Sequence, residues 1–189
     1  MLQAISAFDS TAMLFIQEHI RCGVLTPIMI FFTTLGEAGM VWLLLSAVLL
    51  CFKKTRRTGF LLLLSVAICY VINVWMIKPV VGRPRPFLTV EGLVALTKAP
   101  GELSFPSGHT CASFAAALAL TKCWGKRGAW FYILAVLIAV SRPYVGVHYV
   151  TDIVAGAIVG TLGTLAIFAV AARIEGRKTA RVEENTPVP

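Results

Sequence analysis

Charged residues are scarce in this chain of 189 residues: only 14% are Asp, Glu, Lys or Arg, while 58% are hydrophobic. Soluble domains are usually nearer to roughly 45–50% apolar, so this composition excludes an ordinary soluble protein. The mean hydropathy of +0.82 agrees with that exclusion. The composition predicts an integral membrane protein. Its net charge of +8 is then explained by cationic loops facing the cytoplasm and anionic lipid, so no nucleic-acid partner is expected.

Paired cysteines and clustered carboxylates are also missing. The five cysteines are odd in number, lie mostly inside apolar segments and show no CxxC spacing. They are predicted to pack as small hydrophobic side chains, and they support neither a disulfide framework nor a metal site. No basic region followed by a small-residue cleavage site opens the chain, so we expect no removable signal peptide. We expect no metal and no other cofactor.

What the chain has in abundance is long apolar sequence. A bilayer core of about 30 Å needs about 20 apolar residues, and five segments are long enough, the third only marginally. The last contains Gly156, Gly160 and Gly163, a spacing typical of a closely packing helix face. The segments are Val24–Phe52, Gly59–Ile77, Ser107–Trp124, Gly128–Val147 and Val150–Ala172.

Residues 1–20 differ from these segments, because polar residues interrupt an imperfect helical stripe of apolar ones. This pattern is typical of an amphipathic helix lying in the membrane interface, with a frayed terminus as the alternative. The predicted fold is therefore all-α. It is a polytopic transmembrane helical bundle of about five spans plus an N-terminal interfacial helix, six helices in all.

The orientation follows from the loop charges. Most of the 17 basic residues fall in alternate connections, at 53–57, 122–127 and 173–181. The positive-inside rule places these connections in the cytoplasm. We expect a single membrane domain at 1–176 and a disordered cytoplasmic tail at 177–189. The predicted location is the inner, or plasma, membrane, with several spans.

Three short motifs lie at the opposite, outer ends of the spans. Residues 78–86 read Lys-x6-Arg-Pro, residues 106–109 read Pro-Ser-Gly-His, and residues 141–152 read Ser-Arg-x5-His-x3-Asp. If the last segment is helical, His148 and Asp152 lie on one face, one turn apart. With these three motifs in order, the sequence resembles the type 2 phosphatidic acid phosphatase family. That family also includes vanadium haloperoxidases and soluble bacterial acid phosphatases.

The resemblance implies a mechanism. His148 is expected to be the nucleophile that attacks phosphorus, and Asp152 to fix the tautomer of its ring and stabilise the charged form. His109 is expected to protonate the leaving oxygen and then to activate water. General acid–base help of this kind contributes roughly 10²- to 10⁴-fold.

The remaining motif residues suit a phosphate group on physical grounds. Catalysis of phosphoryl transfer is mainly positioning and stabilisation of charge, which Lys78, Arg85 and Arg142 are predicted to supply. Ser107 and Gly108 begin a helix, where free backbone N–H groups and the helix dipole favour an anion. A charge inside an apolar segment, as at Arg142, usually marks a site.

The predicted function is that of an integral membrane lipid phosphatase working on the extracytoplasmic leaflet. Its expected partners are a lipid phosphate substrate and membrane lipids. The substrate is expected to be undecaprenyl diphosphate or a broad set of lipid phosphates. The alternatives are a phosphatidylglycerophosphate or phosphatidate phosphatase, a lipid phosphotransferase with the same residues, or, as a non-enzyme, a small polytopic transporter.

The roles of a few further residues are less defined by the sequence. Glu37 either faces the substrate cleft or is simply paired at the membrane surface. Arg83 is an extra cation without an assigned role. Tyr144 and Tyr149 are interpreted as aromatic residues of the membrane interface. The connection 83–105 is long enough to be a functional lid.

Overall fold

A computed structural model describes residues 2–98, 101 and 103–184, and in that part of the chain all regular structure is helical. Single turns of other helix types interrupt or flank the α-helices at Ile16–Ile20, Glu37–Gly39 and Ile72–Ile77. The α-helices are α1 (Leu2–Phe15), α2 (Leu25–Leu35), α3 (Met40–Cys51), α4 (Arg56–Val71), α5 (Lys78–Val81), α6 (Pro86–Thr89), α7 (Gly108–Trp124), α8 (Lys126–Ala129), α9 (Phe131–Tyr144) and α10 (Val150–Glu184).

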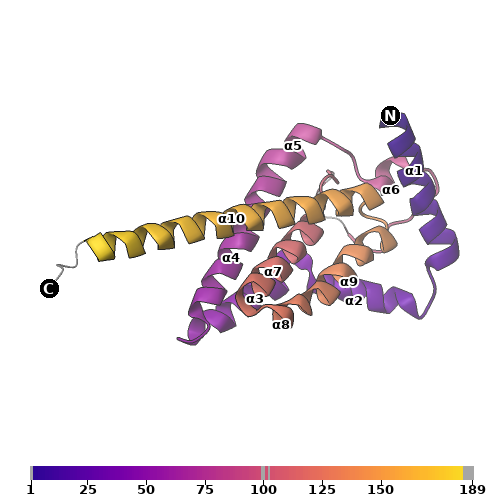
Figure 1. Ribbon diagram of the computed structural model, residues 1–189. Helices are drawn as coiled ribbons and strands as arrows, with labels where there is room; N and C mark the ends of the chain where they lie inside the picture. The colour runs from indigo at the N-terminus through magenta and orange to yellow at the C-terminus, as the bar shows by residue number, and fades with distance from the viewer. Residues whose placement is uncertain (1, 99–100, 102, 185–189) are drawn as a thin grey trace.

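Helix α7 is the centre of the bundle, and it packs against α4, α9 and α10 (Figure 1). Its buried face is rich in alanine, which lets neighbouring backbones approach. A Cβ atom added at Gly156 would lie 2.6 Å from the Ser107 carbonyl oxygen, and one at Gly160 would lie 2.3 Å from that of Cys111. The prediction of a closely packing glycine face is therefore confirmed.

In the described part of the chain, fewer helices qualify as membrane spans by length and composition than the five that were predicted. Within the described residues, two continuous helical stretches are long and apolar enough to cross a membrane, Arg56–Val81 and Val150–Arg177. A third candidate is the pair α2 and α3, which is bent by 45°. Helices α7 and α9 have 17 and 14 residues. The all-helical membrane fold is confirmed in this form, whereas the count of five spans stays a prediction.

The first apolar segment forms two helices, α2 and α3, so the described residues hold more helices than the six that were predicted. The break lies at Gly36–Gly39, where Ala38 and Gly39 adopt φ values of 48° and 71°. Non-glycine residues seldom adopt such a φ. The turn lets Gly36 pack closely, since an added Cβ would lie 2.6 Å from Ile138 and 3.1 Å from the His109 ring.

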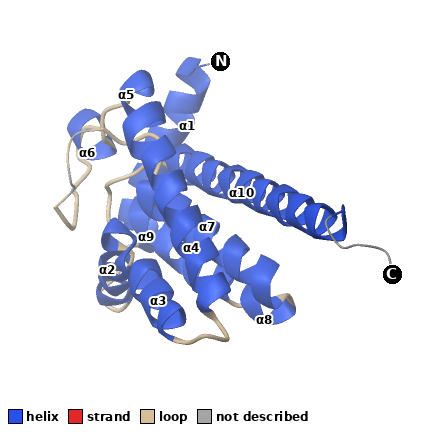
Figure 2. Cartoon of the chain, turned by 90° about the vertical axis from the view of Figure 1, so that its left-hand side faces the viewer, coloured by secondary structure: helices blue, strands red, loops and turns tan. Residues whose placement is uncertain are grey.

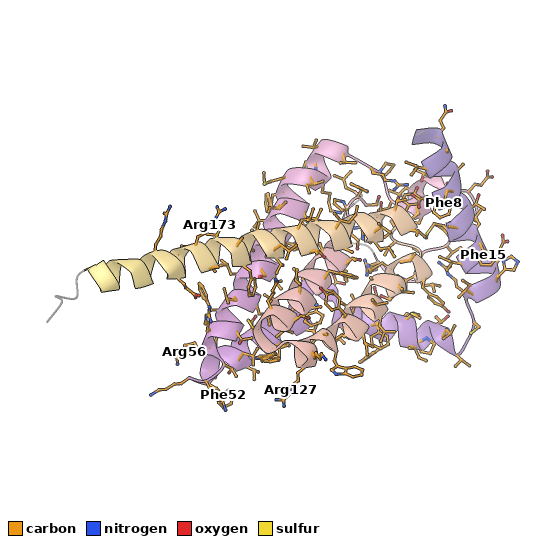
Figure 3. All side chains as sticks on the ribbon, in the orientation of Figure 1. Phe8, Phe15, Phe52, Arg56, Arg127 and Arg173 are labelled. Carbon is orange, nitrogen blue, oxygen red and sulfur yellow. The ribbon has the colours of Figure 1, made fainter. Side chains whose placement is uncertain are left out.

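The two ends of the bundle differ in composition. Helices α1, α5 and α6 gather at one end, together with the start of α10 (Figures 1 and 2). Arg56, Arg127 and Arg173 lie away from α1 and toward the other end (Figure 3). Helix α10 continues to Glu184, so residues 177–184 of the predicted disordered tail are helical. Residues 185–189 lie outside the described residues.

The N-terminal segment holds the long connection between α6 and α7. The Gln17 side chain donates to the Gly92 carbonyl at 2.9 Å and accepts from the Val94 amide at 2.8 Å. Arg21 donates to the Val94 carbonyl at 2.7 Å and to the Tyr144 carbonyl at 2.9 Å. Residues 92–94 are therefore tied both to the N-terminal segment and to the end of α9.

Candidate active site

A cavity of about 210 Å³ lies where the three motifs meet. Six of the eight residues predicted for the site line it, and Ser107 and Asp152 stand behind the lining. The break between α2 and α3 supplies further wall, as do two residues of the α4 region. The lining residues are Glu37, Ala38, Gly39, Tyr70, Val74, Lys78, Arg85, Gly108, His109, Arg142 and His148.

His148 is held by groups on both ring nitrogens. Its Nε2 lies 3.1 Å from Arg85 Nη1, and its Nδ1 lies 3.3 Å from Asp152 Oδ2. A guanidinium can only donate, so Nε2 accepts and the ring proton sits on Nδ1, facing the carboxylate. Burial lowers the pKa of His148 well below its ordinary value, and the charges of Arg142, Arg85 and Lys78 lower it further. The ring is therefore neutral, with the lone pair of Nε2 on the side of the cations.

Asp152 is completely buried and has both carboxylate oxygens occupied. Oδ2 accepts from the Tyr149 amide at 2.9 Å as well as facing His148. Oδ1 accepts from Arg83 Nη1 at 2.9 Å. The predicted pair one helical turn apart is present. The structure adds Arg83 as its third member.

Three cations surround the cavity from three different segments. Lys78 Nζ donates to the carbonyls of Leu103 at 3.1 Å and Pro106 at 3.3 Å. Arg85 Nε donates to the Gly101 carbonyl at 2.8 Å, and its Nη1 donates to that of Val147 at 2.8 Å. These carbonyls belong to the backbone around the site, so they orient the side chains without neutralising their charge.

Arg142 is the most deeply buried of these cations. It is 2% exposed and donates to the Thr33 hydroxyl. Its Nε makes no hydrogen bond within the described part of the chain. A buried donor left unpaired is costly, so the cavity beside Arg142 is suited to an anionic ligand.

The start of α7 faces the same cavity. The Ser107 hydroxyl accepts from the Thr110 amide at 3.4 Å, so it caps the helix rather than lining the cavity. Gly108 does line it. The first turn of α7 therefore presents backbone N–H groups and the positive end of a helix dipole to the cavity.

His109 and Glu37 face each other across the cavity wall. His109 Nε2 lies 3.7 Å from Glu37 Oε2, a distance beyond hydrogen-bond range. Glu37 is about half exposed, at 47%, whereas the His109 side chain is 9% exposed. Of the two interpretations of Glu37, the structure therefore supports both, since Glu37 lines the cleft and lies beside the His109 ring.

Three residues near the candidate site were not recognised from the sequence: Asp9, Tyr144 and Tyr149. Tyr144 and Tyr149 are 2% and 5% exposed, so their interpretation as interface aromatics is wrong. The Tyr149 ring lies beneath Arg83, at 3.7 Å from the guanidinium carbon. Asp9 of α1 reaches the same guanidinium at 2.8 Å. Its signal in the sequence was a lone acid within an apolar helix, which needs a partner when buried.

Comparisons with known proteins agree with this geometry. The profile of the PAP2 superfamily matches residues 58–175. The chain is 36% identical over 145 residues to an undecaprenyl-diphosphatase of Sulfolobus acidocaldarius, covering 75% of this chain and 68% of that protein. It is 29% identical over 211 residues to a lipid A 4'-phosphatase of Bacteroides thetaiotaomicron, covering 100% and 86%.

Two solved structures are similar in fold and sequence. The PAP2-type phosphatidylglycerolphosphate phosphatase of Bacillus subtilis superimposes with a TM-score of 0.71 at 28% identity, covering 90% of this chain and 88% of that one. LpxE of Aquifex aeolicus gives a TM-score of 0.74 at 27% identity, covering 86% and 95%. Because the family profile covers more than half of the chain and the relatives hydrolyse lipid phosphates, the chain belongs to the PAP2 superfamily of membrane lipid phosphatases.

Proposed function

We propose that the chain hydrolyses a lipid phosphate or diphosphate on the extracytoplasmic face of the inner membrane, through a phosphohistidine formed on His148. The observation that carries the proposal is the arrangement of this ring. Its Nε2 points to the cationic side, 3.1 Å from Arg85, and its protonated Nδ1 faces Asp152 at 3.3 Å. Such a ring is a neutral nucleophile with a built-in counter-charge for the cationic intermediate.

The first step breaks the bond between the terminal phosphorus and the oxygen that joins it to the rest of the lipid, which is the bridging oxygen of a diphosphate or the ester oxygen of a monophosphate. Nε2 of His148 attacks phosphorus while protonated His109 gives its proton to the leaving oxygen. The phosphorylated imidazole carries positive charge on the side of Asp152. Lys78, Arg85 and Arg142 hold the phosphoryl oxygens and stabilise the charge spread over them.

The second step returns the enzyme to its starting state. Water attacks phosphorus, His109 now accepts a proton from that water, and the bond between nitrogen and phosphorus breaks. Inorganic phosphate leaves, and His148 recovers the lone pair on Nε2. Each histidine therefore ends in the protonation state in which it began.

The proposed substrate is undecaprenyl diphosphate or a broad set of lipid phosphates. The resemblance to an undecaprenyl-diphosphatase supports the first choice. The alternative substrates are phosphatidylglycerophosphate and phosphatidate. The similarity to a solved phosphatidylglycerolphosphate phosphatase supports the first of these. A phosphotransferase using the same residues would differ only in the acceptor of the second step.

The proposed membrane orientation is supported by the separation of charges. The cavity lies at the end where α1, α5 and α6 gather, and Arg56, Arg127 and Arg173 lie toward the other end (Figure 3). The positive-inside rule then supports a cavity that opens outside the cytoplasm.

The decisive experiment separates the two histidines. We expect His148→Ala to lower phosphate release by about 10⁴-fold or more, and His109→Ala to lower it by about 10²- to 10⁴-fold. With substrate labelled on the phosphate, His109→Ala accumulates labelled protein and the double variant does not. An active His148→Ala enzyme, or label on another residue, contradicts the mechanism.

The substrate is tested with the purified wild-type protein in detergent. Phosphate release is compared for prenyl diphosphates, phosphatidate and phosphatidylglycerophosphate, with and without an acceptor lipid. A preference of tenfold or more in kcat/KM for the prenyl diphosphate, equal to about 1.4 kcal/mol, supports the first choice. Label that appears in the acceptor lipid instead of in free phosphate supports the transferase.

A further inference from the structure

Asp9 is a completely buried carboxylate on α1, a helix otherwise made mostly of apolar residues. Its Oδ2 accepts from Arg83 Nη2 at 2.8 Å, and the Thr151 hydroxyl also donates to this oxygen. Its Oδ1 accepts from the Thr151 amide at 3.1 Å. One acid of the N-terminal segment therefore binds both Arg83 and the first turn of α10.

Arg83 connects this acid to Asp152. Its Nη2 donates to Asp9, while its Nη1 donates to Asp152 Oδ1 at 2.9 Å and to the Thr151 hydroxyl at 2.8 Å. The Tyr149 ring closes one face of the guanidinium at 3.7 Å. The planar fork of Arg83 is thus held between two buried carboxylates, and Arg83 does not line the cavity.

We propose that Asp9 and Arg83 are positioning residues, which hold Asp152 so that its Oδ2 faces Nδ1 of His148. The inference rests on the proposed function, because Asp9 and Arg83 can affect the reaction only if His148 is the nucleophile. Asp9 lies before residues 58–175, which match the family, and Arg83 occupies an unspecified position within Lys-x6-Arg-Pro. Helix α1 is then a part of the active site as well as a surface helix.

Asp9, Arg83 and Asp152 form a largely buried set in which one guanidinium is shared by two carboxylates. Two carboxylates and one guanidinium form a set in which each carboxylate oxygen has a donor. Removing the guanidinium leaves two buried carboxylates without a counter-charge, and removing the Asp9 carboxylate takes away the group that holds one arm of the guanidinium. A simple anchor for α1 needs only Asp9 and the start of α10. The second arm of Arg83 on Asp152 is needed only if the orientation of Asp152 matters.

The test compares kcat, KM and thermal unfolding in detergent for Asp9→Asn, Arg83→Gln and the double variant. We expect kcat to fall by about 10- to 100-fold for each single variant, by analogy with the residues that orient metal ligands in metalloenzymes, while KM changes less than about threefold. Because Asp9 acts through Arg83, the double variant is expected to match Arg83→Gln rather than the product of the two losses.

Glu175→Gln is the matched control. It removes a carboxylate that pairs with Arg57 at 2.6 Å, a contact of the same type located among exposed side chains. Its kcat and KM are expected to equal those of the wild type. If Asp9→Asn fails to fold, Arg83→Lys keeps the positive charge but cannot contact both carboxylates with a planar fork. Its kcat is then expected to fall at an unchanged unfolding temperature.

The pH profile of kcat/KM supplies a readout that a structural role does not move. His148 is faced by Asp152 from α10, Arg142 from α9, His109 from α7 and Lys78 from α5, with Arg85 beside it. Removing the positive charge of Arg83 is expected to move the acid limb to higher pH. Removing the negative charge of Asp9 is expected to move it to lower pH.

The outcomes distinguish failure of the positioning role from failure of the proposed His148 mechanism. If His148→Ala is inactive while Asp9→Asn and Arg83→Gln keep the wild-type kcat and acid limb, the positioning role is overturned and the proposed mechanism stands. If His148→Ala is active, the mechanism itself fails. Losses in the two single variants that multiply in the double variant, with an unmoved acid limb, also overturn the positioning role.

Discussion

The basic residues at the two ends of this molecule have the same chemistry and opposite surroundings. At the cavity, Arg85 and Arg142 are 3% and 2% exposed. Away from it, the side chain of Arg57 is 71% exposed and pairs with Glu175, which is itself 55% exposed. An exposed pair contributes about 0–1 kcal/mol. Burying a charge is far more costly.

This difference shows that burying the arginines of the cavity costs desolvation free energy, which the exposed arginine does not lose. The cavity arginines lose their water and donate to backbone carbonyls, a hydroxyl and a histidine ring. Arg142 Nε has no hydrogen-bond partner within the described residues, so it is available to an anion in the cavity. The Arg57 charge is already screened by solvent and matched by Glu175, so it is suited to orientation in the membrane rather than to catalysis.

The largest expected difference between the two ends is catalytic. We expect Arg142→Gln to lower kcat/KM by about 10³-fold, because it removes a buried donor beside the transferring phosphoryl group. Arg57→Gln removes the same charge at the exposed end and is expected to leave kcat/KM within about twofold. Phosphate release by both purified variants measures the contrast. Equal losses at the two sites would contradict the assignment of Arg142 to phosphate binding.

A smaller difference is expected in stability, between two glycines of α10. Gly160→Ala places a Cβ 2.3 Å from the Cys111 carbonyl oxygen, so α10 must move from α7. We expect the free energy of unfolding to fall by about 1–3 kcal/mol. Gly176 has no atom within 4 Å of an added Cβ, and Gly176→Ala is expected to be neutral or stabilising by up to about 1 kcal/mol. Thermal unfolding in detergent compares them; an unaffected Gly160→Ala would contradict the tight packing.

The smallest expected effect is on the pH profile. Because burial and nearby cations lower the pKa of His148, its ring stays neutral as the pH falls through the usual histidine value of about 6.5. The acid limb of kcat/KM due to His148 is therefore expected below that pH. The measurement uses a substrate with a good leaving group, with its own phosphate titration followed by ³¹P NMR as the reference. A limb above pH 6.5, after correction for the substrate, would contradict the neutral ring.

Local patterns in the sequence predicted much of the site. The three motifs named eight residues, and the structure brings six of them to one cavity, with Ser107 capping α7 and Asp152 behind His148. This succeeded because helix spacing places His148 and Asp152 one turn apart, and because each motif begins or ends an apolar segment. The backbone geometry at Ala38 and Gly39 could not be predicted from the sequence, since it depends on how Gly36 packs against Ile138 and His109.

The sequence by itself determined that this is a membrane protein, that its fold is helical and which chemical groups its candidate site contains. Composition, apolar length and spacing along one helix are local properties, so they can be read without knowing the fold. Only the tertiary structure decided that Asp9 and Arg83 reach Asp152, that Glu37 faces His109 and that Tyr149 is interior. These contacts join residues far apart in the chain, and their existence depends on how α1, α7, α9 and α10 pack together.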